Sequence, residues 1–274
     1  QPGDIPVSLS APYFYTAANV ARVNLAVDLP AQTLQFEKQK GKFHSEVNLL
    51  GIAYREDGSV GARFSDTVRL DLEKKELKEF TQGSFSYPTS FNIAPGKYTL
   101  KVVLSAGGQR FGKYEVPLEI EPYDGKQFHL SGVALSNRAQ PVSELTASLD
   151  AALLEERTPL VFRGLELTPS ASNRFQRNEK VAIYVEVYEP LLLSGTPPLV
   201  GIIYNVIDRR TNQQVFTSNT IPVNNYAQQG NPVIPVAVSL LVDRLPAGEY
   251  KLEVRARDAT GNVSPLRTTD FALD

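Results

Sequence analysis

The sequence predicts an all-β protein built from antiparallel β-sandwiches, and three observations support this fold class. Apolar and polar residues alternate in several short runs, Gly, Pro, Asn and Asp recur between those runs, and one strand-and-turn pattern occurs twice. Such alternation places one face of a strand in a core and the other in solvent, as in antiparallel sheets. Many short strands separated by regular turn signals are typical of a sandwich.

The alternating runs predict strands, and the clearest of them lie at 21–28, 98–102, 181–188 and 250–254. Long helical patterns are missing, so we expect only one or two short helical excursions between strands. One is predicted at 143–156, where Leu145, Leu149 and Leu153 fall on one face of a helix, and a shorter one at 73–80. No β-α-β alternation indicates a parallel sheet.

An internal repeat predicts two domains in tandem. The segment GKYTLKV at 96–102 matches GEYKLEV at 248–254. An offset of roughly 150 residues suits a domain duplication better than a solenoid repeat. The repeated tyrosine resembles the tyrosine corner of immunoglobulin-like and fibronectin-III-like sandwiches, in which the hydroxyl bonds back to the chain. We therefore predict two tandem immunoglobulin/fibronectin-III-like antiparallel β-sandwiches, at 1–122 and 126–274, with the helix at 143–156 in the second.

Composition excludes several classes of function. The net charge is -2 and no block of five like charges occurs, so no basic face for nucleic acid is expected. No apolar stretch approaches the ~20 residues that span a bilayer. Cysteine is absent and there are two histidines, which removes thiolate metal sites and His-rich metal sites. We expect no cofactor.

No set of residues predicts an enzyme. His44 and His129 each lie beside a phenylalanine, and we expect them at the surface or at the domain junction rather than in a catalytic site. Paired carboxylates would be needed for glycoside hydrolysis, but no sequence argument brings two of them together. The acidic candidates are scattered on expected turns and solvent-facing strand positions: Glu155, Glu156, Asp208 and Glu186.

Two acidic turns are candidate metal sites. The first, at 57–61, resembles the start of a von Willebrand A metal motif but lacks its last serine and lies between antiparallel-type strands. The second, at 258–262, contains oxygen side chains suited to calcium. A simple hairpin turn is the favoured interpretation of both, so no metal site is predicted.

An apolar loop is the strongest candidate for contact with a partner. Loops usually lie on the surface, and exposed apolar patches mark interaction sites. We expect the loop at 190–199 to pack against the first domain, the 143–156 segment or another chain, with folding back on its own domain as the alternative. The predicted partner-binding residues are Leu191, Leu192, Leu193, Pro197 and, in a separate loop, Tyr226.

Several segments resemble the C-terminal region of the "VWFA-related" secreted proteins of Acidobacteria. They lie at 43–54, 64–70, 91–98, 130–136, 185–190 and 245–250. In that family the region follows a von Willebrand A domain, so the resemblance implies a part of a longer precursor. It also implies an extracytoplasmic location, whether periplasmic, envelope-associated or secreted, and brings no catalytic or binding residues.

The sequence thus predicts a non-enzymatic structural or protein-interaction module, whose partner is an unknown protein or the upstream domains of the same precursor. The alternative is a carbohydrate-binding module at the cell surface, with a glycan as ligand. A row of solvent-facing tyrosines would favour the alternative, whereas an apolar surface patch near 191–199 would favour the interaction module. Tyr13 and Tyr15, with Phe14 between them, are expected in the core.

Overall fold

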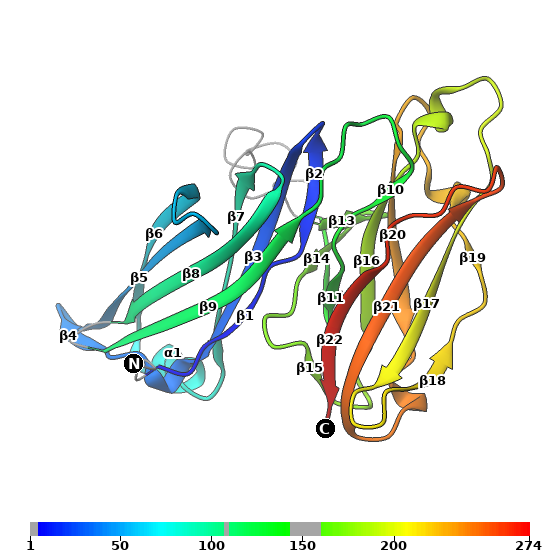
Figure 1. Ribbon diagram of the computed structural model, residues 1–274. Coiled ribbons are helices and arrows are strands. Elements are labelled where there is room, and N and C mark those ends of the chain that lie inside the picture. Colours follow the sequence, from blue (N-terminus) through cyan, green and yellow to red (C-terminus); the bar gives the residue numbers. More distant parts are fainter. Residues whose placement is uncertain (1–4, 107–109, 143–159) are drawn as a thin grey trace.

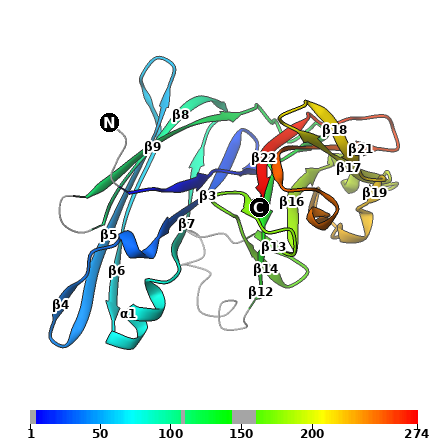
Figure 2. The same ribbon diagram turned by 90° about the horizontal axis from the view of Figure 1, so that it is seen from below.

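The computed structural model describes residues 5–106, 110–142 and 160–274 (Figure 1). Within these ranges the chain is mostly strands in antiparallel sheets, with one α-helix and four short 3-10 helices, so the predicted all-β sandwich fold is confirmed. No helix in the described part is long and apolar enough to cross a membrane. Seen from below, the N-terminal strands and the C-terminal strands form two bodies side by side (Figure 2).

The N-terminal half packs two sheets face to face. One sheet contains β1 (Ser8–Ser10), β2 (Tyr13–Ala17), β3 (Val20–Pro30) and β7 (Ser84–Ile93). The other contains β4 (Glu37–Gln39), β5 (Lys42–Arg55), β6 (Val60–Leu72), β8 (Gly96–Ala106) and β9 (Phe111–Ile120). Alternate apolar residues of both sheets form one core cluster, which includes Val23, Leu25, Leu49, Leu100 and Val102.

The C-terminal half repeats this plan. Its first sheet centres on β16 (Val181–Tyr188), with β10 (His129–Leu130) and β11 (Ala134–Ser136) on one side and β20 (Val233–Leu240) on the other. Its second sheet contains β15 (Arg174–Phe175), β17 (Val200–Asp208), β18 (Gln213–Thr217), β19 (Ile221–Pro222), β21 (Gly248–Asp258) and β22 (Arg267–Leu273). A second core cluster lies between them and includes Ile183, Val185, Ile202, Leu252 and Val254.

A small third sheet and the 3-10 helices complete the described elements. The sheet contains β12 (Arg138–Pro141), β13 (Leu160–Phe162) and β14 (Leu165–Thr168). The 3-10 helices are η1 (Ala31–Thr33), η2 (Pro190–Leu193), η3 (Asn224–Tyr226) and η4 (Val242–Arg244). The predicted short helix at 73–80 forms as α1 (Lys74–Phe80), where Glu73 and Glu76 make a capping box. The helix predicted at 143–156 lies outside the described residues.

The repeated motif adopts the same local geometry in both halves. The Tyr98 hydroxyl donates to the carbonyl of Ala94 at 2.9 Å, and the Tyr250 hydroxyl donates to the carbonyl of Pro246 at 2.8 Å. Each bond spans four residues and ties the start of a strand, β8 or β21, to the preceding turn. The sequence match at 96–102 and 248–254 therefore reflects a shared structure.

One strand departs from the expected one-sided burial. The residues of β16 that face away from the C-terminal core include Tyr184 and Tyr188, and both are buried. Tyr188 joins the N-terminal core cluster, while Tyr184 packs in a third cluster with Phe14 of β2. The prediction that Glu186, on the same face, is a solvated surface charge is wrong, because the N-terminal half covers this face.

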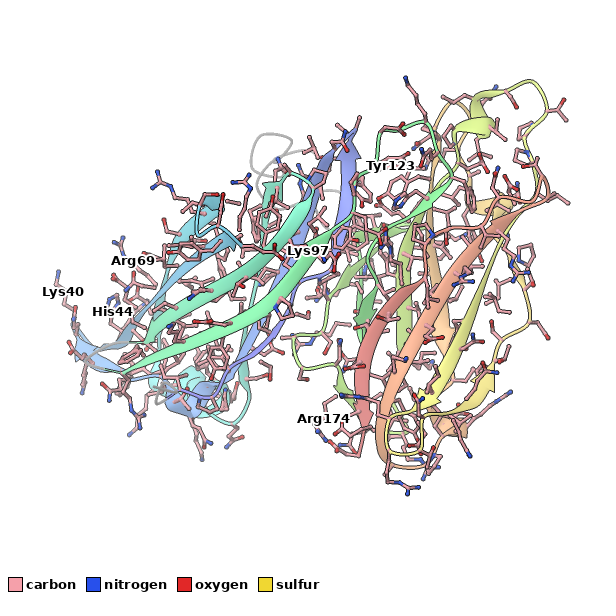
Figure 3. The ribbon with its side chains drawn as sticks, in the orientation of Figure 1. Lys40, His44, Arg69, Lys97, Tyr123 and Arg174 are labelled. Carbon is pink, nitrogen blue, oxygen red and sulfur yellow. The ribbon has the colours of Figure 1, made fainter. Side chains whose placement is uncertain are left out.

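The two halves meet through backbone and side-chain hydrogen bonds at this joint. The backbone N–H of Tyr15 donates to the Tyr188 hydroxyl at 2.8 Å, and the N–H of Gly132 donates to the carbonyl of Tyr13 at 2.8 Å. A Cβ on Gly132 would lie 2.9 Å from the backbone nitrogen of Tyr13, so glycine is required for this close approach. Tyr123, labelled in Figure 3, packs its ring against Tyr15 and Tyr188.

Candidate interaction surface

The two histidines occupy separate and structural positions. His44 on β5 lies 2.8 Å from a carboxylate oxygen of Asp71. His129 is buried at the joint, where its Nδ1 accepts the N–H of Leu130 at 2.9 Å. Burial lowers the pKa of His129, and the neighbouring Arg267 cation lowers it further. These effects favour the neutral form of His129, which packs as part of the joint.

Arg267 ties the segment between the halves to β22. Its Nη1 lies 2.9 Å from Glu121 Oε2, and its Nε donates to the carbonyl of Leu130 at 3.0 Å. Both partners belong to the stretch that leads from β9 into β10, so this buried arginine fastens the connection to the C-terminal half. Its guanidinium also lies over the Tyr13 ring. These contacts hold the two halves together.

The acidic candidates do not converge. Asp208 accepts the N–H groups of Arg210 and Thr211 at 2.8 and 3.0 Å and so stabilises its own turn. Glu186 accepts hydrogen bonds from two tyrosines at the joint. Glu155 and Glu156 lie outside the described residues. Within the part of the chain that the structure describes, no group of three His, Cys, Asp or Glu side chains is placed to share a metal.

A groove of about 570 Å³ lies between the halves. Its walls come partly from Val116 and Pro117 of β9 and partly from Thr268 and Thr269 of β22. Among the described residues that line the groove, Asp270 is the only carboxylate, and its side chain is paired with Arg209 at 3.2 Å.

The apolar loop at 190–199 projects from the C-terminal half at the upper right of Figure 1. Its first residues form η2, and Leu192 packs against the C-terminal core, as expected for a loop that folds back on its own half. Leu191, Leu193 and Leu199 instead remain 41%, 60% and 73% exposed. We call these three residues the apolar tip. Pro197 is exposed between them.

Hydrogen bonds anchor the end of this loop. The Asn224 side chain donates to the carbonyl of Pro198 at 2.8 Å and accepts the N–H of Val200 at 2.6 Å. The N–H of Ala259 donates to the carbonyl of Leu199 at 2.8 Å. The residues on both sides of Leu199 are thus fixed, although its side chain is exposed. The sequence showed the apolar character of this loop but not Asn224, which comes from a separate element, η3.

Tyr226, in η3, has aromatic and cation–π contacts of its own. Its half-buried ring packs edge to face on Phe162 of β13, with 4.9 Å between ring centroids, and the Arg163 guanidinium lies 4.6 Å from the Tyr226 centroid. These contacts hold the Tyr226 ring against Phe162 and Arg163. All 12 tyrosines of the chain lie in the described part, and each is buried or half-buried, including Tyr13 and Tyr15.

Comparisons with known proteins identify no family for this chain. No family model matches it, and no curated protein matches it. Among solved structures, a putative beta-galactosidase from Bacteroides fragilis is 17% identical, with a TM-score of 0.30, over 45% of this chain and 16% of that one. A Salmonella alpha-2-macroglobulin reacted with methylamine is 9% identical, with a TM-score of 0.32, over 98% of this chain and 25% of that one. Similarity at this level supports no functional argument.

Proposed function

We propose that the chain is a non-catalytic structural and protein-interaction module of an exported bacterial protein, with two sandwich domains in tandem. The observation that carries this proposal is the apolar tip, three exposed leucines on a loop whose backbone is held in place. Exposed apolar patches favour association, and a surface already ordered before binding loses less conformational entropy when a partner arrives.

The joint supports the structural part of the proposal. Buried aromatic rings, the Tyr15–Tyr188 hydrogen bond and the position of the buried Arg267 guanidinium over the Tyr13 ring connect the two halves. Such a connection resists bending, because separation of the halves would expose these rings and leave the N–H of Tyr15 without its acceptor. The chain would then act as a stiff spacer that presents the apolar tip at one end.

A protein ligand is better supported than a glycan. A carbohydrate site usually presents aromatic rings to solvent, but none of the tyrosines is fully exposed. The partner that fits the apolar tip is a protein surface with its own apolar patch, either on the upstream part of the same precursor or on a separate envelope protein. We propose an extracytoplasmic location for both.

Photo-crosslinking from the apolar tip tests this proposal. A photoreactive benzoylphenylalanine replaces Leu193 in the otherwise unchanged chain, produced in its native cells and irradiated there. We expect a discrete protein adduct that is lost when Leu191 and Leu199 are also changed to Ser. The melting temperature should remain within about 2 °C, because exposed substitutions change stability by about 0.5 kcal/mol or less.

The matched control carries the photoreactive residue at Val215, which is 46% exposed on β18. It should give no adduct, because its apolar surface is isolated from the tip. The same adduct from both positions, or none from Leu193, would contradict a specific contact through the apolar tip.

A further inference from the structure

Two buried carboxyl groups face each other behind the loop that carries the apolar tip. Glu189, at the end of β16, is 1% exposed, and Asp258, at the end of β21, is 8% exposed. Their side chains lie within hydrogen-bonding distance of each other. Glu189 Oε1 accepts the N–H of Leu191 at 2.9 Å, but no N–H or O–H group donates to Glu189 Oε2.

This pair has no compensating positive side chain. Within the described ranges, neither Glu189 nor Asp258 forms a salt bridge. Two ionised carboxylates buried together without a counter-charge are strongly unfavourable. The site therefore requires a positive species, either a proton on one carboxyl group or a bound cation.

The pKa values of the two carboxyl groups shift in opposite directions. Burial raises the pKa of Glu189, and the adjacent Asp258 raises it further. Burial also raises the pKa of Asp258, but hydrogen bonds from Asn262 and Thr260 outweigh it and leave that pKa below its ordinary value. The hydrogen bonds thus favour the ionised form of Asp258. Glu189 is the carboxyl group whose negative charge needs a positive species nearby.

Two further polar side chains surround Asp258. The Thr260 hydroxyl lies 2.9 Å from each carboxylate oxygen of Asp258, and the Asn262 amide nitrogen donates to Asp258 Oδ2 at 2.7 Å and to Thr260 Oγ1 at 3.0 Å. Asp258, Thr260 and Asn262 occupy alternate positions of one turn, the spacing of the first three side-chain ligands in calcium-binding loops. A shared proton would involve only the two carboxyl groups, whereas a bound cation can also use the Thr260 hydroxyl and the Asn262 amide oxygen.

We propose that Glu189, Asp258, Thr260 and Asn262 form a calcium site. The donor set consists of oxygens alone, which favours a hard cation over zinc or copper. The Asn262 amide supplies its oxygen once it is rotated, because the two orientations of an amide differ only in their hydrogen-bond partners. Water completes the coordination. With two carboxylates in the site, we expect a dissociation constant of roughly 0.1–1 mM, the range of extracellular calcium modules.

The ion would connect two loops at one end of the C-terminal half. Glu189 directly precedes η2, and Asp258 begins the turn whose Ala259 bonds to Leu199. Calcium would therefore stabilise the base of the 190–199 loop. This inference does not depend on the proposed function, because the site is complete whether or not the apolar tip binds a partner.

Calorimetric titration of the intact, chelator-treated chain with calcium chloride at pH 7.5 tests the site. We expect one calcium ion per chain. The melting temperature should rise by about 3 °C for each tenfold increase in free calcium above the dissociation constant. Glu189→Gln keeps the shape of the side chain but removes a charged ligand, so it should weaken calcium binding at least tenfold.

Asp57→Asn is the matched control, because Asp57 accepts the N–H of Ser59 at 2.9 Å in an exposed turn of the N-terminal half. This variant should bind calcium like the wild type. No binding heat and no thermal shift up to about 10 mM calcium, well above the expected range, would overturn the proposal. So would equal calcium affinity in Glu189→Gln. A melting temperature that changes with pH through Glu189 but not with calcium would assign a shared proton to the pair instead.

Discussion

The carboxylate of Glu186 accepts a hydrogen bond on each of its oxygens. Tyr188 donates to Oε2 at 2.7 Å, and Tyr184 donates to Oε1 at 3.2 Å. Burial raises the pKa of Glu186 above its ordinary value of 4.5, although both hydrogen bonds act in the opposite direction. A strand position that the sequence assigns to solvent is in fact part of the joint between the halves.

This raised pKa predicts a specific pH dependence. The folded chain binds the Glu186 proton more tightly than the unfolded chain does. The contribution of this group to stability is therefore fully present below pH 4.5 and is lost as pH rises through its raised folded-state pKa. Glu186→Gln should remove this component, so that stability falls less between pH 4.5 and neutrality. Urea unfolding at several pH values in that range measures the free energy of unfolding of both proteins.

An exposed glutamate provides the comparison for this pH experiment. Glu37→Gln, on β4, should leave the pH dependence of unfolding as in the wild type. If Glu186→Gln retained the full wild-type dependence, the assignment of that dependence to Glu186 would be wrong.

The 190–199 loop shows how a segment can be ordered without being buried. Most of its side chains are exposed, yet a single side chain from η3, Asn224, bonds to Pro198 and Val200 at its end. An anchored backbone explains why three leucines can be held in solvent contact, where an unconstrained loop would sample conformations that bury them.

Asn224→Ala should release the end of this loop. The substitution leaves the Val200 N–H and the Pro198 carbonyl without these partners, which costs about 1–3 kcal/mol if the groups stay buried. Hydrogen exchange should become faster at Val200 and in the residues just before it. The neighbouring Asn225→Ala, at an exposed position, should leave exchange in this loop unchanged. Equal exchange in both variants would rule out Asn224 as the anchor.

The two halves of the chain share a contact in which both sides contribute to one core. Tyr188 belongs to the C-terminal β16 but packs in the N-terminal core cluster, and its hydroxyl accepts the N–H of Tyr15. The small third cluster likewise combines Phe14 of β2 with Tyr184 and Leu167 from the C-terminal half. Bending between the halves would expose these aromatic rings and break the hydrogen bond.

Tyr188→Phe should loosen this connection. It leaves the buried N–H of Tyr15 without its acceptor, which costs about 1–3 kcal/mol. Small-angle X-ray scattering should show a larger radius of gyration and a broader distribution of distances. Tyr204→Phe is the matched control, since that hydroxyl donates to the Ser239 carbonyl at 3.1 Å within the C-terminal half. Scattering from Tyr188→Phe identical to that of the wild type would contradict a stiff joint.

Local patterns were sufficient to predict the clearest strands and one short helix. Alternation predicted β16 within 181–188, and the repeat predicted matching turns before Tyr98 and Tyr250. The short helix at 73–80 was also predicted and forms as α1. The apolar character of 190–199 indicated an unusual loop, but its anchor and the direction of each leucine were not predictable, because Asn224 and Ala259 come from other parts of the chain.

By itself, then, the sequence determined the all-β class, the positions of the most clearly alternating strands and the repeated corner, because these depend on neighbours within a few residues along the chain. Only the tertiary structure decided that the outer face of β16 is covered and that Glu189 meets Asp258. Both outcomes depend on how separate strands and loops pack. A polar residue on an alternating strand has the same local pattern whether its outer face meets water or another sheet.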